Sequence, residues 1–221
     1  MALAGNELRC WSAADAEAVV QRSSGIRGVK CRLPGDRTVF WDARGQLHVW
    51  DMAKKTLSLK VNLGPEGLRR CACSPEGGTL ALVSSEGDLT CWDLADGRRI
   101  DLAPKRVSLF SMATGGACMY GDDDDGLYLL DIAAGSTELV GRHPGVSGLA
   151  FCLALNVAAS CGEDRTLRVW DTLRLKPLAA FTLETQIGAC AMSPDGSTVV
   201  VGDELGHVHF IRLHLESRGA S

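Results

Sequence analysis

The sequence lacks a membrane-spanning stretch, an N-terminal run typical of a signal peptide and an excess of positive charge. No apolar run approaches the ~18 residues that a transmembrane helix needs. The N-terminal MALAGNELRCW has no basic region and is interrupted by Glu7 before a hydrophobic segment forms. The net charge of the 221 residues is −4, so no overall positive field attracts a phosphate backbone. We therefore expect neither membrane insertion nor nucleic-acid binding.

Motifs for metal binding and catalysis are also missing. The nine cysteines include no CxxC pair, which argues against a zinc or redox motif. Cys152 and Cys190 fall in apolar runs, where a thiol behaves as a small hydrophobe. We therefore expect a reducing compartment, the cytosol in the first place with the nucleus left open. The sequence has no GxxxxGK[ST] phosphate loop, no GxSxG elbow and no HExxH pair. It predicts a protein that is not an enzyme and carries no cofactor.

What the sequence does have is a repeat. An alternating apolar run that ends in an aromatic or aliphatic residue, usually followed by Asp, recurs as LRCWS, LHVWD, LTCWD, LYLLD, LRVWD and VHFIR. The marker residues of these runs are Trp11, Trp50, Trp92, Leu130, Trp170 and Ile211, at intervals of 39, 42, 38, 40 and 41 residues. Segments such as SPEGGT and SPDGST lie out of phase with the markers, and their Pro and Gly are typical of tight turns. Short apolar runs on each side of these turns predict β-hairpins.

These runs, and above all RHPGVSGLAFCLALNVAASCGEDRTLRVWD at residues 142–171, resemble the WD-repeat family. The resemblance implies an all-β fold, a β-propeller of four-stranded antiparallel blades over residues 1–214, followed by a disordered tail at 215–221. It also implies a hydrogen-bonded network that fixes a blade and performs no chemistry. The residues at the matching positions are His143, Ser160, Asp164 and Trp170.

The strand count predicts about five complete blades after a partial N-terminal one, an awkward number for a closed ring. We expect the chain to be a fragment or short isoform of a longer protein. The alternative is a ring that is distorted or completed by a partner. The C-terminal GDELGHVHFIRLHLES is similar, more weakly, to the last blade of propellers in NACHT-type and apoptosome-type switch proteins.

Two segments invite a metal-site hypothesis. The first, YGDDDDGLYLLD at residues 120–131, contains Asp122–Asp125, and carboxylates suit hard cations. Its place in the repeat predicts instead a turn between second and third strands, where Asp is favoured; an acidic contact for a basic partner is the functional alternative. In the second, HVHFIRLH, His207 and His209 would project from one strand face with Asp203 nearby. Such pairs are more often surface or packed histidines, so the sequence predicts no metal site.

For function, the sequence favours a non-catalytic scaffold for a protein or peptide partner. The alternative is a sensor or autoinhibitory propeller of a larger nucleotide-dependent switch. The resemblance implies that the recognition surface comprises the turns with Asp124 and Asp164 and the connections before each first strand. The candidate contacts are Arg44, Arg69, Glu86, Lys105, Asp123, Arg165 and Gln186. The segment FWDAR at residues 40–44 also resembles the WD-x-Arg box that docks on ubiquitin-ligase adaptors, but it lies nine residues before the in-phase Trp50.

Overall fold

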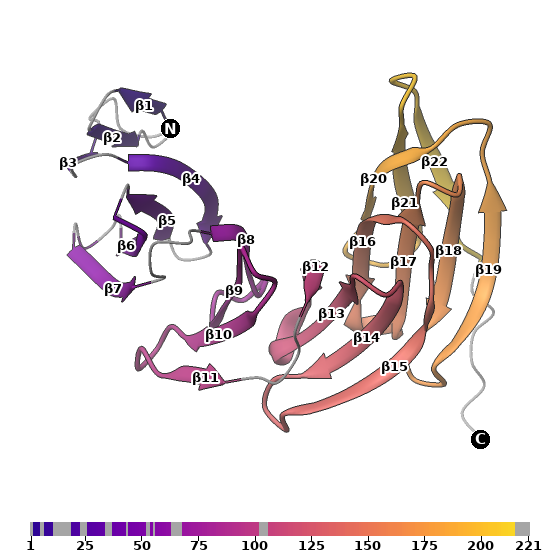
Figure 1. The fold of residues 1–221 in the computed structure, drawn as a ribbon, viewed down its shortest axis with the longest axis horizontal. Coiled ribbons are helices and arrows are strands. Elements are labelled where there is room, and N and C mark those ends of the chain that lie inside the picture. Colours follow the sequence, from indigo (N-terminus) through magenta and orange to yellow (C-terminus); the bar gives the residue numbers. More distant parts are fainter. Residues whose placement is uncertain are drawn as a thin grey trace. The chain divides into compact units, whose positions relative to one another are not determined.

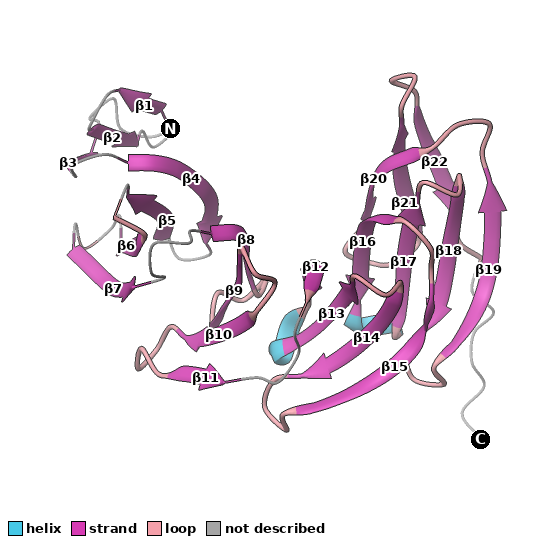
Figure 2. Cartoon of the chain, viewed as in Figure 1, coloured by secondary structure: helices cyan, strands magenta, loops and turns pink. Residues whose placement is uncertain are grey.

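The computed structural model divides the chain into two compact units, Met1–Pro104 (unit 1) and Lys105–Ser221 (unit 2). The described residues form strands and two short 3₁₀ helices (Figures 1 and 2). Trp11, Lys105 and the predicted tail at 215–221 lie outside the described residues. The structure describes residues 2–4, 7–10, 19–22, 26–33, 37–42, 44–51, 54, 56–62, 68–101 and 106–214. Side chains are described from residue 37 onward, except that of Asp101.

Unit 1 contains three antiparallel sheets among its described residues, with strand orders β1-β2-β3, β4-β5-β6-β7 and β8-β9-β10-β11. Each sheet is a simple meander, because every strand pairs with its neighbour in sequence. The strands are β1 (Ala2–Ala4), β2 (Glu7–Cys10), β3 (Val19–Arg22), β4 (Ile26–Leu33), β5 (Arg37–Asp42), β6 (Gln46–Asp51), β7 (Thr56–Asn62), β8 (Leu68–Cys73), β9 (Thr79–Ser84), β10 (Leu89–Asp93) and β11 (Arg99–Asp101).

Unit 2 repeats this arrangement in three further sheets, β12-β13-β14-β15, β16-β17-β18-β19 and β20-β21-β22. The first strands β12, β16 and β20 contact one another in that order, so the three sheets lie side by side (Figure 1). None of the helices among the described residues is long and apolar enough to cross a membrane. The elements are β12 (Val107–Met112), η1 (Thr114–Gly116), β13 (Ala117–Asp122), β14 (Gly126–Asp131), β15 (Ser136–Arg142), β16 (Val146–Cys152), η2 (Leu153–Leu155), β17 (Val157–Gly162), β18 (Thr166–Asp171), β19 (Lys176–Thr182), β20 (Ile187–Met192), β21 (Thr198–Asp203) and β22 (Val208–Arg212).

The sheets reproduce the predicted repeat. In the third strand of each sheet from β6 onward, the marker is the penultimate residue, and these markers are Trp50, Trp92, Leu130, Trp170 and Ile211. From β3 onward, the described chain supplies five complete sets of four strands. Each set consists of the last strand of one sheet and the first three strands of the next. Counted as sheets, four are four-stranded and the first and last are three-stranded. The two counts differ because the sequence repeat begins on the last strand of one sheet and ends within the next.

Burial is greatest on the second strands and least on the fourth strands. All six residues of β17 are buried, whereas most residues of β19 are exposed. Neighbouring sheets in unit 2 therefore stack through their inner strands. Cys161 is buried in one of the two cores, and Cys190, named from the sequence as a thiol in an apolar run, packs against that core. The core between the first two sheets includes Met119, Leu127, Ala158 and Trp170, and the core between the last two includes Ala159, Cys161, Ile187, Val199 and Val201.

The predicted Pro-Gly turns join first and second strands. In SPEGGT, Gly77 has φ +79° and donates its N–H to the Ser74 carbonyl at 2.8 Å. In SPDGST, Gly196 has φ +66° and donates to Ser193 at the same distance. A positive φ is accessible to Gly without strain, so these two hairpins follow directly from local sequence.

Candidate functional site

The second sheet of unit 2 contains the expected network of four side chains. Trp170 Nε1 donates to Ser160 Oγ at 2.8 Å, and Ser160 Oγ lies 2.6 Å from His143 Nδ1. His143 Nε2 lies 3.1 Å from Asp164 Oδ1. Because an indole only donates and a carboxylate only accepts, the polarity is fixed: Ser160 donates to Nδ1, and His143 donates through Nε2 to Asp164. His143 and Ser160 are fully buried and Trp170 is 3% exposed, so the network can position strands but is closed to a substrate.

Thr166 and Arg168 extend this network toward the surface. Thr166 donates to Asp164 Oδ1 from both its hydroxyl, at 2.7 Å, and its backbone N–H, at 2.9 Å. Arg168 Nη2 donates to Asp164 Oδ2 at 2.8 Å. Burial alone raises the pKa of Asp164, but hydrogen bonds from Thr166 and His143 outweigh it and lower this pKa to about 2. Burial lowers the pKa of His143, so at neutral pH an ionised carboxylate accepts from a neutral imidazole.

The network occurs in this sheet because Ser160, on the strand that pairs with the strand of Trp170, accepts a hydrogen bond from the indole. Trp50 and Trp92 are the equivalents of Trp170 in unit 1, and their buried Nε1 atoms have no hydrogen-bond partner among the described residues. By strand register, the positions equivalent to Ser160 hold Phe40 and Leu82. An apolar side chain there cannot accept from the indole, which explains why the Trp markers recur without the network.

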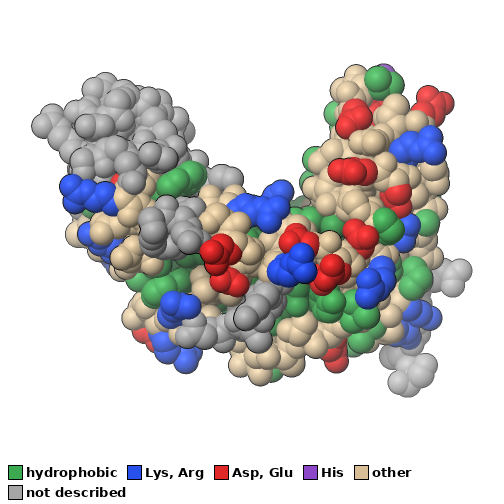
Figure 3. Space-filling view, viewed as in Figure 1, with side chains coloured by type: hydrophobic (Ala, Val, Ile, Leu, Met, Phe, Trp, Pro, Cys, Tyr) green, Lys and Arg blue, Asp and Glu red, His purple; other side chains and the backbone are tan. Residues whose placement is uncertain are grey.

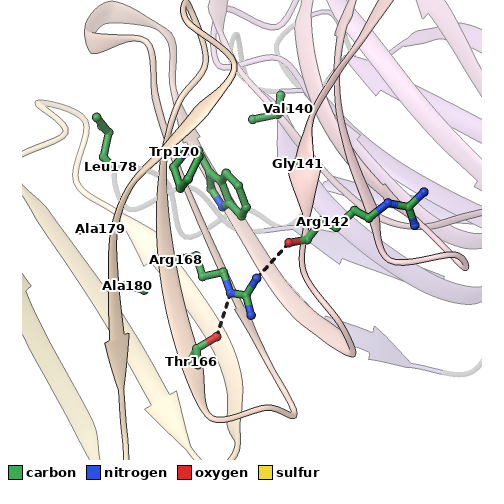
Figure 4. Close-up of a pocket in the computed structure, with 10 residues that line it drawn as sticks. Val140, Gly141, Arg142, Thr166, Arg168, Trp170, Leu178, Ala179 and Ala180 are labelled. Carbon is green, nitrogen blue, oxygen red and sulfur yellow. Dashed lines mark hydrogen bonds between the residues drawn. The ribbon is translucent and has the colours of Figure 1, made fainter.

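A groove of about 660 Å³ lies beside the network, between the outer strands of two neighbouring sheets (Figure 4). Trp170 forms part of its wall, and a Cβ at Gly141 would fall 2.3 Å from the indole Cζ3. Arg168 spans the groove, where its Nη1 donates to the Arg142 carbonyl at 3.0 Å. The network is thereby tied to the preceding sheet. The lining residues are Val140, Gly141, Arg142, Thr166, Arg168, Trp170, Pro177, Leu178, Ala179 and Ala180.

The acidic run forms the turn between β13 and β14, as predicted. Asp122 Oδ1 accepts from the backbone N–H groups of Asp124 and Gly126 at 3.0 and 2.7 Å. Asp125 has φ +64°, and its Oδ1 accepts from Gly145 N–H at 3.0 Å. Asp123 and Asp124 are exposed and lie 3.5 and 3.9 Å from Arg106. Two of the four carboxylates thus accept hydrogen bonds from backbone N–H groups, and the other two project into solvent.

The structure places the six described candidates for partner contact at exposed positions. Four of them lie in turns between second and third strands, whereas Arg69 is on β8 and Gln186 immediately precedes β20. The four in turns are Arg44, Glu86, Asp123 and Arg165. Of the FWDAR segment, the first three residues belong to the second strand β5 and Arg44 to the following turn.

Backbone hydrogen bonds join the turns of unit 2 into one continuous edge. His143 N–H donates to the Asp125 carbonyl, and Glu163 N–H donates to Gly145. Farther along, Leu183 N–H donates to Arg165, and Glu204 N–H donates to Gln186. We call residues 122–126, 142–146, 162–166, 182–187 and 203–207 the turn edge. Its acidic residues outnumber its basic ones, and Figure 3 shows both signs of charge on the visible face of unit 2. The acidic residues are Asp122, Asp123, Asp124, Asp125, Glu163, Asp164, Glu184, Asp203 and Glu204, and the basic ones are Arg142 and Arg165.

Comparisons with known proteins agree with this architecture. The family model "WD domain, G-beta repeat" matches residues 135–171, the segment that contains the whole network. The chain is 24% identical over 195 residues to Transcription factor unc-37 of Caenorhabditis elegans, covering 78% of this chain and 31% of the relative. It is 24% identical over 194 residues to Protein groucho of Drosophila melanogaster, covering 87% of this chain and 22% of the relative. These matches place a WD repeat in this chain and support the WD-repeat family.

The WD-repeat fold is supported independently by structure. Kluyveromyces lactis Hsv2 superposes with a TM-score of 0.78 at 16% identity, covering 96% of this chain and 70% of that chain. The fold is a β-propeller, as the resemblance implied. The chain spans less than a third of the length of the two curated relatives. The WD-repeat matches support the role of a protein-interaction scaffold.

Sequence reasoning missed a recurring aspartate at the end of three second strands. The last residue of β5, β13 and β21 is Asp, and its Oδ1 accepts from backbone N–H groups two and four residues later. In the last sheet, Asp203 Oδ2 also lies 3.1 Å from His207 Nδ1 and 3.0 Å from His209 Nε2. The hydrogen bond from His209 is the largest cause of the lowered pKa of Asp203. The sequence analysis noted the spacing of Asp203, His207 and His209, but not that the turn would leave one Asp203 oxygen facing both rings.

Proposed function

We propose that the turn edge of unit 2 is a docking surface for a Lys- and Arg-rich segment of a partner protein. The observation that carries the proposal concerns three glutamates. The side chains of Glu163, Glu184 and Glu204 are exposed, and no described residue forms an ion pair with them. Charge complementarity of this kind guides association and selects partners more than it sets affinity.

The edge is also held in shape before any partner arrives. In each of the three turns, one aspartate accepts from backbone N–H groups: Asp122, Asp164 and Asp203. The exposed carboxylates Asp123, Glu163 and Glu204 are their immediate neighbours in sequence. A surface whose backbone is already fixed loses less conformational entropy when it binds. The arrangement therefore suits recognition by a rigid scaffold, and the chain would act without catalysis.

The test is a binding titration with a fluorescently labelled Lys/Arg-rich peptide, compared with a Glu-rich peptide of equal length. The edge variant carries Glu163→Gln and Glu204→Gln. Neither of these glutamate side chains accepts a hydrogen bond from a described backbone N–H group. Two exposed ion pairs worth about 0.5 kcal/mol each would be lost, so we expect about fivefold weaker binding of the basic peptide. Binding to the wild-type chain should also weaken as the salt concentration rises.

The matched control replaces two exposed carboxylates outside the turn edge, Glu76→Gln and Glu138→Gln. It removes the same net charge from the chain, so a purely global electrostatic effect would weaken binding equally in both variants. Equal affinities for the edge variant and the control, or no preference for the basic over the acidic peptide, would exclude the turn edge as the docking surface.

A further inference from the structure

The β21–β22 turn brings the side chains of three potential metal ligands close together. Asp203 Oδ1 accepts from Leu205 N–H at 3.0 Å and His207 N–H at 2.8 Å, so this oxygen is committed to the turn. The second oxygen, Oδ2, faces two imidazole nitrogens, His207 Nδ1 at 3.1 Å and His209 Nε2 at 3.0 Å. The Asp203 side chain is only 5% exposed. The carboxylate is therefore fixed by its own turn and presents a single oxygen to both rings.

The two histidines lie on one face of the chain because they are two residues apart at the start of a strand. One ligand atom from each of the three residues lies within 4.8 Å of the other two. The ring centroids are 6.2 Å apart and nearly perpendicular. Two imidazoles and one carboxylate are a donor set that zinc accepts with tetrahedral geometry, leaving a fourth position open.

A second, independent observation comes from the segment facing the turn. A pocket of about 320 Å³ is lined by the three residues together with Thr182–Thr185 and Leu205. In that wall, Thr185 Oγ1 is buried and has no hydrogen-bond partner among the described residues. A buried hydroxyl without a partner is costly, and an ion-bound water in the pocket would give it one. Glu184, in the same wall, is an exposed carboxylate.

We propose that Asp203, His207 and His209 form a binding site for a divalent transition metal ion of the zinc type. Asp203 binds through Oδ2, His207 through Nδ1 and His209 through Nε2. Each neutral imidazole moves its proton to the other ring nitrogen, so the nitrogen that now donates to Asp203 becomes a ligand without a change in ring charge. The nitrogen ligands favour zinc over calcium or magnesium, which prefer oxygen.

The chain contains a matched position that has one ligand fewer. In the β5–β6 turn, Asp42 corresponds to Asp203, Gln46 to His207 and His48 to His209. Asp42 Oδ1 likewise accepts from two backbone N–H groups, and Asp42 Oδ2 lies 3.1 Å from His48 Nε2. His48 stacks on Phe40 at 4.8 Å between ring centroids. The β5–β6 turn thus shows the same turn in its purely structural form, and His207 is the residue that distinguishes the two.

The experiment is calorimetric titration of Zn²⁺ into the reduced 221-residue chain and into two variants. His207→Gln gives the last turn the residues of the β5–β6 turn, and His207 is 63% exposed, so folding should be preserved. We expect this variant to bind zinc at least about tenfold more weakly, since even outer partners of a metal ligand contribute that much. His48→Gln should bind as the wild-type chain does.

Thiolates also bind zinc, so a second readout follows the histidine ring signals by NMR during the titration. The proposal predicts that the signals of His207 and His209 shift together with zinc uptake. It is overturned if His207→Gln binds zinc as well as the wild-type chain, if uptake leaves both ring signals unchanged, or if the wild-type chain takes up no zinc.

Discussion

Replacement of Ser160 by Ala tests the blade network most sharply. The hydroxyl accepts from Trp170 and donates to His143, and all three side chains are almost fully buried. Its removal leaves one indole donor and one imidazole acceptor without partners. Each buried unpaired group costs about 1–3 kcal/mol, so we expect the free energy of unfolding to fall by about 2–4 kcal/mol. That is a large share of the roughly 5–15 kcal/mol that stabilises a typical domain.

The assay is urea denaturation followed by circular dichroism, in which the free energy difference follows from the midpoint and slope of the transition. Ser136→Ala, at an exposed position of β15, is the matched control, and we expect it to change stability by less than about 0.5 kcal/mol. If Ser160→Ala costs no more than this control, the hydroxyl does not hold the blade and the reasoning from the network is refuted.

Three further predictions concern the same network and the residues packed against it. Trp170→Phe should destabilise the chain about 1 kcal/mol more than Trp92→Phe in urea denaturation, because only Trp170 loses a hydrogen bond; equal losses would contradict this. Burial lowers the pKa of His143 below its ordinary 6.5, so the unfolded chain takes up the proton first. Stability should be full above pH 6.5 and fall as the pH drops below it, and His143→Gln should reduce this slope in melts at stepped pH; an unchanged slope would argue against a buried neutral ring. Gly141→Ala should lower stability by about 1–3 kcal/mol in thermal or urea denaturation, because the new methyl overlaps the indole; a neutral result would show that the sheets shift freely.

Much of the fold was predictable because its determinants are local and repeated. The spacing of Trp50, Trp92 and Trp170 fixes the period of the sheets, and the Pro-Gly segments fix the hairpins. The turn formed by Asp122–Asp125 followed from its place in the period. The network was predictable in one sheet, since the family resemblance supplied each position and the residue types at those positions can form the hydrogen bonds.

The remaining site depends on contacts that sequence spacing does not determine. Thr166 and Arg168 bind Asp164 because their side chains leave the strand toward the same oxygen pair. The convergence on Asp203 required a different fact: the turn engages one carboxylate oxygen and leaves the other facing both histidines. Spacing predicted that the two rings share a face, but not which oxygen they would meet.

The central claim, that the turn edge of unit 2 receives a basic partner segment, is tested most directly by hydrogen exchange with and without the bound Lys/Arg-rich peptide. The account predicts added protection of backbone N–H groups in residues 122–126, 162–166 and 203–207, with little change in the turns that join first and second strands. Protection confined to those opposite turns, or to unit 1, would contradict it.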